Sequence, residues 1–235
     1  GGRRRRRGRT IRSMGYLAYI LLVFGASYAL RYPYLLGAAG VVWLLRRRLP
    51  DPYLYFKHAG HVRRLKAEIA HNADNVTARR DLAKIWLAKR RPRRALGLLE
   101  EARRRDRESA ELPFLLGKAL YEAGRAEESL PLIVEAAQKS ERQMYGEAFL
   151  VAGKALRKLG RFAEAEDAFV RYLTINSSSV EGRVLLACVK RALNDAAGAK
   201  AATREALETF AAVPRFRRRA ELKWYLRARL MTVGL

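Results

Sequence analysis

The chain has 235 residues, half of them hydrophobic, so it is long and apolar enough to bury a core. Its one cysteine, Cys188, excludes an intrachain disulfide framework. The formal charge of +25 is uneven: residues 1–66 hold 15 Lys and Arg against one acid, and residues 111–208 hold 14 against 14. The excess therefore lies outside the central region, which argues against a nucleic-acid-binding body and makes nucleic acid an unexpected partner.

Residues 1–13 form a basic tail that precedes two short apolar runs. The runs, residues 14–30 and 32–45, would be about 25 Å and 21 Å long as helices, against roughly 30 Å for a bilayer core. One continuous span would be far too long and would place Arg31 near the bilayer centre. A hairpin that turns at residues 31–34 keeps both arginine clusters on one side of the membrane, as the positive-inside rule favours.

We therefore predict a membrane anchor of two short helices over residues 14–48, followed by a juxtamembrane segment over residues 49–75 that contains a helix. A single crossing by the first run is the alternative, and the poor cleavage pattern disfavours a signal peptide. The clustered arginines lie at the membrane surface in this interpretation, where anionic lipid is their expected partner; the simpler alternative for the N-terminal run is a solvated tail that only sets the orientation in the membrane. The clustered arginines are Arg3, Arg4, Arg5, Arg6, Arg7, Arg46, Arg47 and Arg48.

From about residue 76 the chain repeats itself with a period near 34 residues. One column of the repeat holds the small residues Ala83, Gly117, Gly153 and Ala187. The turn column holds Arg90, Gly124, Gly160 and Asn194. A second small column holds Ala95, Ser129, Ala165 and Ala199, and a large apolar residue follows at Leu99, Ile133 and Phe169. This pattern predicts stacked antiparallel helical hairpins, in which the small residues allow the two helices to approach closely.

The segments LGKALYEAGRAEESL (116–130) and AGKALRKLGRFAEAEDAF (152–169) carry these positions most clearly, and they resemble the tetratricopeptide repeat family. The resemblance covers roughly residues 76–210. It implies an all-α solenoid of about four repeats, which we assign to residues 76–212.

Residues 213–235 are predicted to form a basic helix that caps the open end of the solenoid. Leu222, Leu226 and Leu230 share one stripe of this helix, and the basic residues lie largely elsewhere. Binding of lipid or of a protein partner is the alternative role for such an amphipathic helix.

The resemblance also implies a binding groove, because tetratricopeptide arrays usually bind extended peptides along the first helix of each unit. The residues expected to line it are Arg80, Lys84, Phe114, Lys118, Tyr121, Leu150, Lys154, Arg157 and Arg191. Lys84, Lys118 and Lys154 occupy one repeat position, so we expect a basic line with apolar residues beside it. Such a surface suits an acidic or C-terminal peptide. The Lys/Asn carboxylate clamp of the family's chaperone-binding subgroup is incomplete, because lysines replace its asparagine.

No phosphate loop, metal-ligand spacing or nucleophile–base set is present, so we predict no enzyme, no cofactor and no small-molecule substrate. We expect a scaffold that recruits or assembles a protein partner at the bacterial inner membrane. The repeats are expected on the cytoplasmic side, and the periplasmic side is the alternative orientation. An accessory subunit of a larger membrane complex is the rival function, and an RNA- or ribosome-associated membrane factor is the lesser one.

Overall fold

The computed structural model describes residues 34, 59–140 and 146–233. The chain divides into two compact units, Gly1–Tyr55 and Phe56–Leu235. The predicted basic tail and membrane anchor lie outside the described residues, apart from Tyr34. Within the described part of the chain, no helix is both long enough and apolar enough to span a bilayer.

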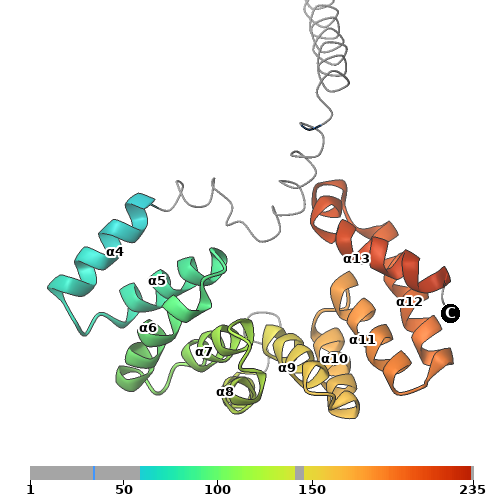
Figure 1. Ribbon diagram of the computed structural model, residues 1–235, viewed down its shortest axis with the longest axis horizontal. Coiled ribbons are helices and arrows are strands. Elements are labelled where there is room, and N and C mark those ends of the chain that lie inside the picture. The colour runs from blue at the N-terminus through green and yellow to red at the C-terminus, as the bar shows by residue number, and fades with distance from the viewer. Residues whose placement is uncertain (1–33, 35–58, 141–145, 234–235) are drawn as a thin grey trace, which may run out of the picture. The chain divides into compact units, whose positions relative to one another are not determined.

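The described residues of the second unit form a succession of helices (Figure 1). The first helix is α4 (Ala59–His71), which lies within the segment predicted to lead into the repeats. Four hairpins follow: α5 (Val76–Ala88) with α6 (Pro92–Arg105), α7 (Glu111–Glu122) with α8 (Ala126–Lys139), α9 (Glu147–Lys158) with α10 (Phe162–Ile175), and α11 (Val180–Ala192) with α12 (Ala196–Ala212). The last helix is α13 (Arg215–Val233).

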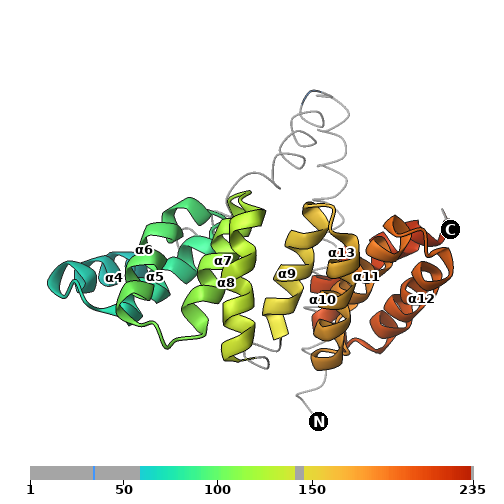
Figure 2. The same cartoon turned by 90° about the horizontal axis from the view of Figure 1, so that it is seen from below.

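Consecutive hairpins pack on one another through α6 and α7, α8 and α9, and α10 and α11 (Figure 2). The first helices α5, α7, α9 and α11 also contact one another in chain order. The structure therefore confirms the predicted solenoid of four helical repeats with a further helix at its C-terminal end.

The turn column adopts the left-handed backbone conformation in all four hairpins. The φ angles are 54° at Arg90, 95° at Gly124, 78° at Gly160 and 62° at Asn194. In each hairpin the next residue donates its backbone N–H to the carbonyl five positions earlier, as Arg125 does to Leu120 over 2.9 Å. This bond is the mark of a Schellman ending, which stops the first helix at the same place in every unit.

The small columns are buried where the two helices of a hairpin meet. A Cβ atom on Gly117 would lie 2.7 Å from Cγ1 of Ile133, and one on Gly153 would lie 2.6 Å from the ring of Phe169. Ile133 and Phe169 thus fill the space above the glycine of their own hairpin. The sequence pattern predicts small residues at this crossing. Only glycine fits in these two hairpins, whereas the first and last hairpins carry Ala83 and Ala187 there.

Candidate functional site

The structure places all nine predicted groove residues on the first helices of the four hairpins. Arg80 and Lys84 lie on α5; Phe114, Lys118 and Tyr121 lie on α7; Leu150, Lys154 and Arg157 lie on α9; and Arg191 lies on α11. We call the surface that these residues form the first-helix face. Because α5, α7, α9 and α11 contact one another in order, this face runs continuously from one hairpin to the next.

Each of the three predicted lysines forms an ion pair with a glutamate at the start of the next first helix. The Nζ of Lys154 lies 2.6 Å from Oε1 of Glu181, and the Nζ of Lys118 lies 3.7 Å from Oε2 of Glu147. The third pair of this lysine–glutamate ladder joins Lys84 to Glu111. Each glutamate sits in the first turn of its helix, where a negative charge is favoured by the helix dipole.

The ladder alters the electrostatics expected of this face. The three lysines lie in the predicted line, but a carboxylate from the next hairpin neutralises each of them. A fourth cation is also paired, because Nη1 of Arg80 lies 3.2 Å from Oε2 of Glu111. The three glutamates were not among the predicted groove residues, although they recur at the repeat spacing and are the signal that could have predicted the ladder.

Two of the predicted apolar contacts belong to the core. The side chains of Phe114 and Leu150 are only 3% and 8% exposed, so they present little surface to a ligand. The Nζ of Lys118 lies 5.8 Å from the centre of the Phe114 ring, which is close enough for a cation–π contact. Phe114 and Leu150 therefore pack in the core beneath the first-helix face and are not available as contacts for a ligand.

Tyr121 and Arg157 occupy the same repeat position on neighbouring first helices, and both are half-buried. Burial raises the pKa of the Tyr121 hydroxyl, and the positive charge of Arg157 acts in the opposite direction. The Nε of Arg157 is buried without a hydrogen-bond partner among the described residues. Neither Arg157 nor the exposed Arg191 forms an ion pair within the part of the chain that the structure describes.

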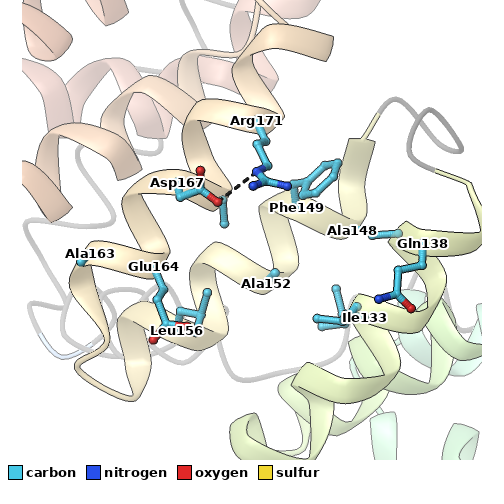
Figure 3. Close-up of a pocket in the computed structure, with 13 residues that line it drawn as sticks. Ile133, Gln138, Ala148, Phe149, Ala152, Leu156, Ala163, Glu164, Asp167 and Arg171 are labelled. Carbon is cyan, nitrogen blue, oxygen red and sulfur yellow. Dashed lines mark ion pairs between the residues drawn. The ribbon is translucent and has the colours of Figure 1, made fainter.

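A separate hollow of about 570 Å³ lies between α8, α9 and α10 (Figure 3). Its walls are mainly apolar and include Ile133, Phe149 and Leu156. At its edge, Nε of Arg171 lies 2.9 Å from Oδ2 of Asp167. This hollow was not predicted from the sequence, because it depends on how the second and third hairpins pack against each other.

Comparisons with known proteins agree on the fold. A family model described as tetratricopeptide repeat matches residues 80–143 and 114–180. The crystal structure of MamA protein is similar with a TM-score of 0.60 and 19% identity, over 65% of this chain and 82% of that chain. YrrB, a TPR protein with an unusual peptide-binding site, gives a TM-score of 0.57 and 17% identity, over 73% of this chain and 91% of that chain.

MamA from Desulfovibrio magneticus RS-1, from its residue 41 to its end, gives a TM-score of 0.54 and 14% identity, over 68% of this chain and 97% of that chain. A search of curated protein sequences found no match. At these identities the similarity to solved structures concerns the fold alone.

Proposed function

We propose that residues 80–180 of the chain belong to the tetratricopeptide repeat family. On this premise, we propose that the first-helix face binds an extended segment of a protein partner. Repeats of this family are interaction scaffolds, and nothing in the described residues indicates catalysis. The proposal adds which side chains of this chain make the contact and what kind of peptide they suit.

One observation carries the proposal: Arg157 forms no ion pair among the described residues, and it occupies the repeat position that the half-buried Tyr121 holds on the neighbouring first helix. A guanidinium matches a carboxylate in two parallel hydrogen bonds, and a tyrosine ring offers rigid apolar area at a small entropic cost. Together they suit a peptide that carries a carboxylate next to an apolar side chain. Arg191, which is exposed on the next first helix, extends the positive charge along the same path.

The ladder refines the kind of partner expected. A peptide carboxylate that displaced Glu181 from Lys154 would leave a half-buried glutamate without its cation, so displacement costs free energy. We therefore expect the unpaired arginines, and not the three lysines, to select an acidic or C-terminal peptide.

We further propose that this scaffold acts at the bacterial inner membrane. The apolar runs in residues 14–48, between clusters of arginine, support an N-terminal anchor of two short helices. With such an anchor, a partner bound by the repeats is recruited to or assembled at the cytoplasmic surface of that membrane.

Affinity purification tests the binding face. The full chain would be purified in mild detergent, and the proteins that accompany it would be identified and quantified. Combining Tyr121→Ala with Arg157→Ala should lower recovery of the partner at least tenfold, as expected for an aromatic residue and an arginine at the centre of an interface. Arg204→Ala, on the exposed surface of α12, serves as the matched control and should leave recovery unchanged. Equal recovery with both variants would refute this binding face.

A further inference from the structure

The C-terminal helix α13 carries a leucine stripe that faces away from the repeats. Leu222, Leu226 and Leu230 are 45%, 53% and 74% exposed. At about 100° per residue, their spacing of four keeps them on one side of the helix over two turns. We call this surface the outer face of α13. Three exposed leucines in a row differ from the isolated apolar residues that are normal on a protein surface.

The opposite side of α13 holds the helix on the repeats. The ring of Tyr225 stacks on that of Phe210 in α12, with the two ring centres 4.4 Å apart. Ala228 and Met231 are buried, and Sδ of Met231 lies 3.9 Å from Sγ of Cys188 in α11. The predicted capping helix therefore does cover the end of the solenoid, but it does so without using its leucine stripe.

Cations surround the stripe. Helix α13 carries seven of them: Arg215, Arg217, Arg218, Arg219, Lys223, Arg227 and Arg229. On a helical wheel of about 100° per residue, Arg229 lies on one side of the leucines, and Lys223 and Arg227 lie on the other. The one acid of the helix, Glu221, lies on the side that meets the repeats, where its Oε2 is buried.

We propose that α13 lies on an anionic lipid surface, with its leucines at the boundary between headgroups and acyl chains. Long arginine and lysine side chains can bury their methylene stems beside the leucines and place their charges on lipid phosphates. The cations beside the leucines, with no acid on the outer face, complement a negatively charged leaflet. Nucleic acid or an acidic protein segment would use the cations, but neither needs a row of leucines between them.

This contact goes beyond the proposed function. It concerns a different helix from the first-helix face, and it does not require the N-terminal anchor. Loss of partner binding would leave it unaffected.

A fluorescent label on the outer face tests the proposal in the full chain. In a Cys188→Ser background, Leu226→Cys is labelled with the environment-sensitive fluorophore NBD. Vesicles of phosphatidylcholine, with and without phosphatidylglycerol, are the probe. We expect a blue shift and a several-fold rise in emission only with phosphatidylglycerol, and brominated lipid should quench that emission. Glu127→Cys, on the exposed surface of α8, is the matched control and should show no change.

Two further variants separate the contributions. Replacing Arg227 and Arg229 by Gln should abolish most of the spectral shift, and high salt should reverse it in the parent chain. The proposal is overturned if the label shows the same emission in both vesicles. It is also overturned if emission responds to acidic peptide, to nucleic acid or to protein concentration alone, since each of those results assigns the face to another occupant.

Discussion

At the residue scale, the lysine–glutamate ladder links each hairpin to the next. Lys154 and Glu181 are each about a quarter exposed, so their attraction is partly screened by water and contributes on the order of 1 kcal/mol or less. The effect of the pairs on how the hairpins align is more important than their contribution to stability. Because equivalent pairs recur at three successive junctions, they favour the same register between one hairpin and the next.

Replacing glycine by alanine should change the free energy of unfolding in opposite directions at Gly153 and at Gly97. Gly153→Ala forces a methyl group against the buried ring of Phe169 and should lower the free energy of unfolding by about 1–3 kcal/mol. Gly97→Ala, in the middle of α6, meets nothing within 4 Å and should raise it by about 0.5–1 kcal/mol. Urea unfolding followed by circular dichroism measures both. Similar shifts of the same sign would contradict the close helix crossing.

At the element scale, the length of each first helix is set by its left-handed turn. Gly124 and Gly160 take this conformation without strain, whereas Arg90 and Asn194 carry a Cβ atom in the same place. The turn chemistry is local, so it could be predicted from the sequence. How α13 docks is not local, because its packing side is selected by aromatic and sulfur contacts with α12 and α11 and is not the side that carries the leucine stripe.

Glu221 gives α13 a predicted dependence of stability on pH. Burial raises the pKa of its carboxyl group and the negative charge of Glu181 adds to the effect, while Arg217 and Lys223 oppose it. The unfolded chain therefore loses this proton at a lower pH than the folded chain does. The group destabilises the fold increasingly as pH rises from about 4.3, the ordinary pKa of glutamate, through the raised pKa.

Glu221→Gln should accordingly raise the unfolding temperature at neutral pH. The gain should disappear at about pH 3, more than one unit below the ordinary pKa of glutamate, where the carboxyl group is protonated in both states. Thermal unfolding of both proteins over this pH range checks the sign. A lower unfolding temperature for the variant at neutral pH would show that the ionised carboxylate stabilises α13.

At the scale of the whole molecule, the array itself was predictable, whereas its surface was only partly so. A period near 34 residues with small residues at fixed positions is enough to predict stacked hairpins, because each unit buries its core only with its neighbours. The burial of Phe114, the pairing of Lys118 and the hollow beside α9 depend on how one hairpin rests on the next. The membrane anchor in residues 14–48 stays a prediction.

The most direct test of the account asks which face of the repeats touches a partner in the cell. A photo-crosslinking amino acid would replace Tyr121 on the first-helix face or, in a separate variant, Val170 on α10, which is 44% exposed. The full chain would be irradiated in its native membrane, and the crosslinked proteins would be identified. We predict one discrete protein adduct from position 121 and none from position 170. An adduct from position 170 with none from position 121 would contradict the proposed binding face.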